Sequence, residues 1–128
     1  MPPQSRPVIR VKVRISSQDF SREETLDLTV DPTSIYSWIP AEVGARIGIL
    51  FPDRRRLRRP EGSIVERTVG QVHVGLEGKQ GMSFVVLAES GDSTVLGELT
   101  LTSLGLEVDP NTNALREIEW YYALAAAT

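Results

Sequence analysis

The residues best suited to chemistry in this sequence lie within positions 28–40, where an apolar segment leads into an acid. The apolar residues alternate as in a strand, Asp31 follows at the strand exit, and Thr33 and Ser34 then supply two hydroxyl groups. A carboxylate in this position can act as a general acid or base. It can equally accept local backbone hydrogen bonds and form a turn, which is common for Asp. The residues elsewhere in the sequence are needed to distinguish the catalytic role of Asp31 from the turn-forming one.

The composition leaves few other kinds of catalytic site. The 128 residues include no cysteine, and His73 is the only histidine. A thiol nucleophile, a disulfide and a Cys-based metal site are therefore excluded. With a single histidine, one chain also has almost no residues from which to build a zinc site or a Ser–His pair. We predict no metal and no cofactor. His73 alternates with Val72 and Val74 in an expected strand, which predicts a histidine on the surface face.

Charge and hydropathy indicate a soluble protein. The formal net charge of −3 and the pI near 5.2 argue against nucleic acid as the main partner. No apolar run approaches the roughly 20 residues that span a bilayer, and the N-terminus lacks the apolar segment of a secretory signal. We therefore expect a cytoplasmic protein with no membrane partner. A flexible lead-in (1–7), one domain (8–124) and a short tail (125–128) are the expected divisions.

Hydrophobic periodicity predicts an all-β, mainly antiparallel domain with one or two short helices. Period-two alternation is strongest at residues 8–15 and 25–30, separated by a polar turn, and this is typical of a hairpin. Further strands are expected at 64–68, 69–76, 82–88, 94–97, 106–108 and 115–124. The first expected helix begins at Pro40 and ends at Gly48. The second covers 98–104, with Leu99 and Leu101 inward and Gly105 at its end.

Five arginines stand between Phe51 and Pro60: Arg54, Arg55, Arg56, Arg58 and Arg59. A patch that binds nucleic acid or an acidic peptide is one interpretation. No aromatic residues interleave with these arginines for base stacking. We therefore interpret the segment as a solvated connection in an otherwise acidic protein.

The order of these parts resembles that of the retropepsin-like aspartic proteases, particularly their small bacterial and archaeal members, over roughly residues 8–119. Residues 30–40 align without gaps to the family's Asp-(Thr/Ser)-Gly-Ala loop and the Ile-Pro that follows it. Residues 61–70 resemble the flap hairpin and its return strand. Residues 95–110 resemble the family's Leu-Leu-Gly, helix, Gly-Leu and Asp-Pro ending. The resemblance implies a retropepsin-like barrel.

The family's chemistry implies a role for each matching residue. Each subunit of a homodimer would supply one Asp31, since a two-fold axis duplicates every group. Of two carboxylates sharing a site, one keeps a proton and polarises the peptide carbonyl, while the other activates water. The turn formed by Glu61, Gly62 and Ser63 would close over a peptide or an unfolded protein substrate.

The active-site loop departs from the family pattern at three positions. Pro32 replaces a Thr or Ser and has neither a hydroxyl nor a backbone N–H. Thr33 replaces a glycine and adds a Cβ beside the acid, and Ser34 replaces an alanine. Val-Asp-Pro also recurs at 108–110, where it predicts an ordinary turn. The alternative function is therefore a catalytically impaired homologue that acts as a dimeric peptide-binding or protein-interaction module.

A further alternative concerns the last expected strand, residues 115–124. Its aromatic residues Trp120, Tyr121 and Tyr122 favour assembly with another protein, because aromatic side chains are enriched at interfaces. Burial of the same residues in the domain's own core explains the pattern equally well.

Overall fold

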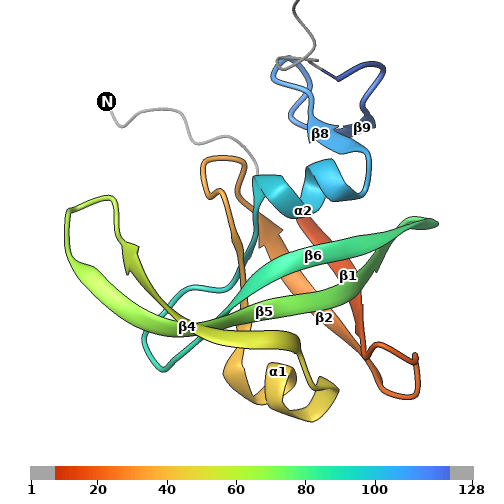
Figure 1. Cartoon of the computed structure of the whole chain (residues 1–128). Coiled ribbons are helices and arrows are strands. Elements are labelled where there is room, and N and C mark those ends of the chain that lie inside the picture. The colour runs from red at the N-terminus through yellow and green to blue at the C-terminus, as the bar shows by residue number, and fades with distance from the viewer. Residues whose placement is uncertain (1–7, 122–128) are drawn as a thin grey trace, which may run out of the picture.

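The computed structural model describes residues 8–121, and most of these residues form strands (Figure 1). The predicted all-β class with two short helices is confirmed. The expected lead-in (1–7) and tail (125–128) lie outside the described residues. None of the helices in the described part is long and apolar enough to cross a membrane. In chain order the elements are β1 (Arg10–Ser16), β2 (Glu23–Val30), β3 (Ser37–Pro40), α1 (Ala41–Ile47), β4 (Leu50–Arg58), β5 (Ile64–Leu76), β6 (Lys79–Ala88), β7 (Val95–Leu96), α2 (Glu98–Ser103), β8 (Leu106–Val108) and β9 (Leu115–Glu117).

The main sheet has seven strands in the order β1-β2-β7-β3-β6-β5-β4, and β1 also pairs with β5. The pairing therefore returns to its start, and β4 lies outside this ring. The β1–β2 hairpin is antiparallel as predicted. The sheet as a whole is mixed, because β2 pairs with β7 and β3 pairs with β6 in parallel. These parallel pairs join strands distant in sequence, which alternation within one strand does not reveal.

The core is filled by apolar side chains from both helices and from most strands of the ring. Ile39, Val43 and Ile47 are at most 3% exposed, so α1 and the residue before Pro40 turn one apolar face to the core. Pro40 caps the N-terminus of α1, and Gly48 follows the helix at φ 80° while its N–H donates to the Gly44 carbonyl. A left-handed residue at this position favours glycine. The sequence signals for α1 were therefore correct.

The second helix faces the core differently from the prediction. Leu101 is buried as expected, but Leu99 is 40% exposed and Thr100 is fully buried in its place. The hydroxyl of Thr100 lies within hydrogen-bonding distance of the Ser37 and Ser83 hydroxyls, which makes its burial tolerable. Hydropathy does not mark Thr100 as a core residue, because the hydroxyl groups that make its burial possible are far away in the sequence.

The arginine-rich segment is a strand, so the predicted solvated connection was wrong in secondary structure. β4 pairs with the first half of β5 in register from Asp53↔Val69 to Arg58↔Ile64. Most of its side chains are exposed on both faces of this two-stranded ribbon, so no alternation marks it as a strand. β5 itself is one 13-residue strand, where the sequence suggested two. The ribbon of β4 and β5 projects from the sheet in Figure 1.

The last predicted strand is shorter than expected. β9 pairs with β8 in a separate two-stranded sheet that lies beside α2 (Figure 1). Trp120 and Tyr121 follow it and are 64% and 57% exposed in the single chain. Burial in the domain's own core is therefore wrong for these two residues. Tyr122 lies outside the described residues.

Candidate functional site

Asp31 lies where β2 leaves the sheet, and its backbone is fixed by the neighbouring strand. Val30 pairs with Leu96 in β7, and the Asp31 N–H donates to the Leu96 carbonyl at 2.9 Å. The side chain is half-buried. This parallel pairing holds the carboxylate at the mouth of the loop formed by residues 31–36.

The carboxylate of Asp31 accepts two hydrogen bonds from Thr33. The Thr33 N–H donates to Asp31 Oδ1 at 3.0 Å and the Thr33 hydroxyl donates to the same oxygen at 2.5 Å. The Ser34 N–H donates to the Asp31 carbonyl at 3.1 Å, which completes the turn. Pro32 and Thr33 are exposed, so the loop takes the bulkier residues without burying them. The Thr33 hydroxyl thus binds the acid directly.

The 31–36 loop is fastened to the start of α2. The N–H groups of Glu98 and Leu99 donate to the carbonyls of Ser34 and Ile35 at 2.8 and 3.0 Å. Ser34 is one of the predicted loop residues, and its hydroxyl donates to the Tyr36 carbonyl at 2.7 Å.

Gly97 makes this close approach possible. A Cβ added there would come within 2.9 Å of the Ser34 carbonyl oxygen and closer still to the Tyr36 carbonyl group. Only a residue without a side chain fits between the two segments.

Three buried hydroxyl residues pack together at the start of α2, next to the 31–36 loop, and the sequence analysis did not identify them. The Gly97 N–H donates to Ser37 Oγ at 2.8 Å, and Thr100 Oγ1 lies 2.5 Å from Ser37 Oγ and 2.7 Å from Ser83 Oγ. Each of these hydroxyl residues is at most 3% exposed. A fully satisfied buried network of this kind fixes one geometry. Its sequence signal is weak: small polar residues inside otherwise apolar elements.

The turn between β4 and β5 forms the opposite wall of a pocket beside Asp31. The Arg59 N–H donates to the Ser63 carbonyl and the Gly62 N–H to the Arg59 carbonyl, both at 2.8 Å, and Gly62 has a φ of 101°. The Ser63 hydroxyl donates to the Glu61 carboxylate, and this bond holds the pKa of Glu61 below its usual value.

This pocket has a volume of about 340 Å³ and brings the predicted acid and part of the predicted flap together. Asp31, Thr33 and Ser34 line one side, and Arg59, Pro60 and Glu61 line the other. Of the predicted flap residues, Glu61 lies in the lining, whereas Gly62 and Ser63 do not. The space between the 31–34 loop and the β4–β5 hairpin turn is therefore large enough to hold a small ligand group.

A charge cluster around Asp92 fixes the hairpin turn in this position. Arg67 donates to both Asp92 carboxylate oxygens at 2.7 and 3.0 Å, and Arg59 donates to Oδ1 at 2.5 Å. The Glu89 N–H donates to Oδ2 at 2.9 Å. The Asp92 side chain is only 3% exposed, and these partners, Arg67 above all, lower its pKa from 3.8 to about 2. The sequence indicated only a turn at residues 89–93.

The four arginines within β4 lie on the exposed ribbon. Arg54 pairs with Glu66 and approaches Glu89, and Arg55 pairs with Asp53. These ion pairs are more than half exposed and contribute little to stability. The arginine-rich segment therefore enters the pocket through Arg59 alone among its five arginines.

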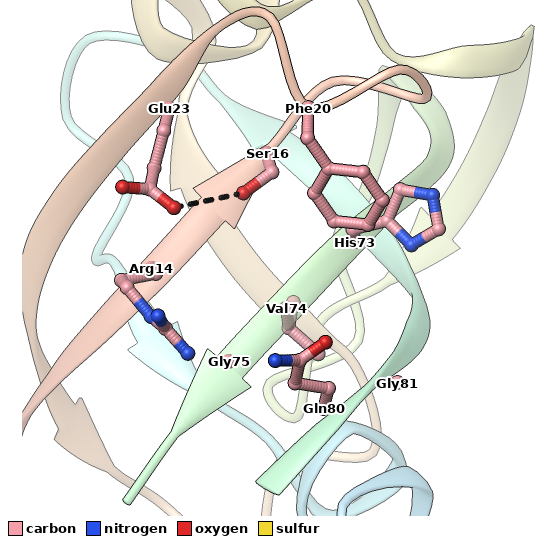
Figure 2. A pocket seen from close by; sticks show the side chains of 9 residues that line it. All are labelled: Arg14, Ser16, Phe20, Glu23, His73, Val74, Gly75, Gln80 and Gly81. Atoms are coloured by element: carbon pink, nitrogen blue, oxygen red, sulfur yellow. Dashed lines mark hydrogen bonds between the residues drawn. The ribbon is translucent and has the colours of Figure 1, made fainter. Parts of the chain in front are cut away.

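Two other hollows on the described surface are of comparable or larger size. A groove of about 620 Å³ adjoins the other side of Asp31 and includes Val8, Ile9 and Val108. A pocket of about 290 Å³ lies among β1, β2, β5 and β6 and shares no lining residue with the Asp31 pocket or with this groove (Figure 2). Residues 8–121 contain no group of three or more His, Cys, Asp or Glu side chains placed to hold a metal ion.

Comparison with known proteins adds no family to this geometry. No protein-family model matches the sequence, and no curated protein matches it either.

Proposed function

We propose that this protein is a homodimeric, retropepsin-like aspartic endopeptidase in which two Asp31 side chains form the catalytic pair. The observation that carries the proposal is the pocket between the 31–34 loop and the hairpin turn, with Asp31 on one wall and Glu61 on the other. The order of elements supports it: a hairpin, an acid loop, a short helix, a projecting hairpin and a second Gly-helix segment follow one another as the resemblance predicts.

The electrostatics of the pocket single out Asp31 among its acids. Asp92 is neutralised by two arginines, and with a pKa of about 2 it stays ionised and cannot donate a proton to a leaving group at ordinary pH. Glu61 is held by Ser63 at the exposed turn. Asp31 has no ion pair with any residue of the described chain, so its carboxylate is available to a partner of its own kind.

The catalytic step requires the second copy. Two carboxylates that share a site cannot both ionise readily, so one holds a proton and the other takes one from water. The water oxygen then bonds to the peptide carbonyl carbon, while the protonated carboxyl donates to the carbonyl oxygen. Breaking the C–N bond passes a proton to the leaving nitrogen and restores the shared proton. Binding the peptide between loop and hairpin aligns the bond for attack.

Exposed apolar side chains beside Asp31 support a symmetric dimer. Ile35 and Leu99 are 57% and 40% exposed, and the backbone bond between these two residues places them side by side next to the acid loop. A second copy that covers this surface would bury both side chains and bring the two loops together. The hairpin turns would then stand over a cleft shared by the two chains.

A second candidate is peptide binding without hydrolysis, and the contacts of Asp31 favour it. Asp109, in the repeated Val-Asp-Pro segment, accepts a 2.8 Å bond from the N–H of Asn111, two residues on, as Asp31 does from Thr33. Asp109 makes an ordinary turn. An Asp31 held in the same way, with the Thr33 hydroxyl added, resembles a structural acid. Such a module would bind extended peptides by strand addition.

Cleavage of a fluorescein-labelled, unfolded casein across pH 3–8 separates the two candidates. The endopeptidase proposal predicts cleavage that peaks at acidic pH and is lost in Asp31→Asn, while Asp109→Asn serves as the matched control and keeps it. Binding of the labelled substrate with no cleavage at any pH supports the second candidate. Activity that survives in Asp31→Asn contradicts the paired-acid mechanism.

A further inference from the structure

The pocket in Figure 2 is separate from the Asp31 site and is built by β1, β5, β6, the loop of residues 17–22 and the start of β2 at Glu23. Its volume is about 290 Å³, near the lower limit for small-molecule sites, so it suits a small ligand. The strands place its polar residues opposite one another, because Arg14 pairs with Gly75, Ser16 with His73 and Gly75 with Gln80. All of these residues therefore face the same side of the sheet.

Arg14 is a half-buried cation that has no anionic partner among the described residues. It forms no hydrogen bond or ion pair with any described residue, whereas Arg46 and Arg67 each bind a carboxylate. Its guanidinium lies across Gly75, where an added Cβ would come within 3.1 Å of Arg14 Cζ and Nε. The glycine thus leaves space for the guanidinium to lie flat against the sheet. A planar guanidinium in this setting is suited to a carboxylate, which it binds with two parallel bonds.

Glu23 faces the same hollow and is likewise without a charged partner in the described chain (Figure 2). Its carboxylate accepts one long bond, 3.5 Å, from the Ser16 hydroxyl. Arg14 and Glu23 do not approach each other within ion-pair distance, yet both line one small pocket. A ligand that carries one positive and one negative group satisfies both side chains at once. A dianion such as phosphate would meet repulsion from Glu23.

Two stacked aromatic rings, Phe20 and His73, line one part of the pocket. Phe20 stacks on His73 with ring centroids 4.5 Å apart, and Phe20 is 59% exposed with a φ of 61°, a strained conformation for a residue with a side chain. Asp19 fixes this loop by accepting bonds from the Ser17 and Ser21 hydroxyls and the Ser21 N–H. The exposed Phe20 ring therefore offers an apolar face to a ligand.

We propose that this pocket binds a small zwitterion of the α-amino acid class, with its carboxylate on Arg14, its ammonium group on Glu23 and an apolar side chain against Phe20. The opposite charges of Arg14 and Glu23 balance each other, which matches a ligand of zero net charge. The Gln80 side chain, also in the lining, is available to a second carboxylate oxygen. The site is independent of the proposed peptidase function, because it has no residue in common with the Asp31 pocket.

The test is a chemical-shift titration of the ¹⁵N-labelled full chain at pH 7 with L-phenylalanine. Saturable shifts are expected for residues 17–22 and 73–75. N-acetyl-L-phenylalanine, which lacks the ammonium group, and 2-phenylethylamine, which lacks the carboxylate, should each bind about tenfold more weakly, the loss expected from one charge-assisted bond. No saturable shift at about 10 mM L-phenylalanine, where millimolar affinity is still detected, overturns the proposal.

Variants assign the two ends of the ligand. Arg14→Gln should weaken L-phenylalanine binding about tenfold, whereas the matched control Lys12→Gln, on the same strand, should leave it unchanged. Glu23→Gln should weaken L-phenylalanine but not its N-acetyl derivative. Tighter binding of inorganic phosphate than of L-phenylalanine at the same amides identifies a plain anion site and overturns the zwitterion. Asp31→Asn should leave the titration unchanged, so failure of the peptidase proposal does not affect this result.

Discussion

Replacing Asp92 with Asn tests whether the buried charge cluster holds the hairpin turn beside Asp31. The pKa of Asp92 is lowered from 3.8 to about 2, first by Arg67, and the side chain is 3% exposed. At 1.36 kcal/mol per pKa unit this lowering corresponds to about 2 kcal/mol of folding free energy. We expect Asp92→Asn to lose roughly 2 kcal/mol of stability at pH 7, because Arg59 and Arg67 then have no charged partner at this position.

The pH dependence of this loss has a definite sign. A carboxyl whose pKa is lower in the folded state stabilises the protein fully above its unfolded pKa, here 3.8, and loses that contribution as the pH falls through about 2. Urea unfolding of the wild type and Asp92→Asn at several pH values should therefore show a gap that is constant from pH 7 to about pH 5 and shrinks below pH 3.8.

The control and the contradicting result are equally specific. Asp27 forms an ion pair with Lys12 on the surface, with side chains 56% and 75% exposed. Asp27→Asn should cost no more than about 0.5 kcal/mol, as exposed pairs usually do. Equal losses in the two variants, or a gap at Asp92 that does not change with pH, would refute the account of the cluster.

Three other perturbations test the loop and the dimer. Gly97→Ala should destabilise the fold by about 2 kcal/mol in urea unfolding, because its Cβ meets two carbonyl groups of the acid loop; a loss below about 0.5 kcal/mol contradicts this packing. Ile35→Asp should raise the dimer dissociation constant at least about tenfold in analytical ultracentrifugation, and an unchanged constant removes Ile35 from the interface. Pro32→Thr combined with Thr33→Gly should raise kcat/KM for peptide cleavage about tenfold or more if the altered loop limits catalysis; no gain counts against that explanation.

The parts of the fold that local patterns encode were predictable. The first hairpin followed from strict alternation of apolar and polar residues, and α1 followed from its flanking Pro40 and Gly48. β4 gave no such pattern, because both of its faces are exposed and its pairing with β5 alone makes it a strand. The parallel pairs of the mixed sheet join segments that are distant in sequence, and the residue pattern within each strand does not reveal its partner.

The candidate site was predictable only where neighbours in sequence are neighbours in space. The turn at Asp31 depends on Thr33 and Ser34, and the sequence placed these residues together. The ion pairs of Asp92 span 25 and 33 residues. From the sequence alone Asp92 could be interpreted only as part of a turn, and not as the centre of a buried charge cluster. Burial of Thr100 depends on hydroxyl groups 63 and 17 residues away. Such contacts follow from the fold and not from any local motif.

Mixing wild type with Asp31→Asn tests the shared catalytic pair most directly. If each site needs one Asp31 from each chain, adding excess Asp31→Asn protein to a fixed amount of wild type and allowing subunits to exchange should suppress casein cleavage toward zero, because nearly every wild-type chain then pairs with a variant. Asp109→Asn protein added in the same excess should not lower the rate. Cleavage that stays at its initial rate with excess Asp31→Asn, under conditions where exchange is confirmed, would contradict a site completed by two copies of Asp31.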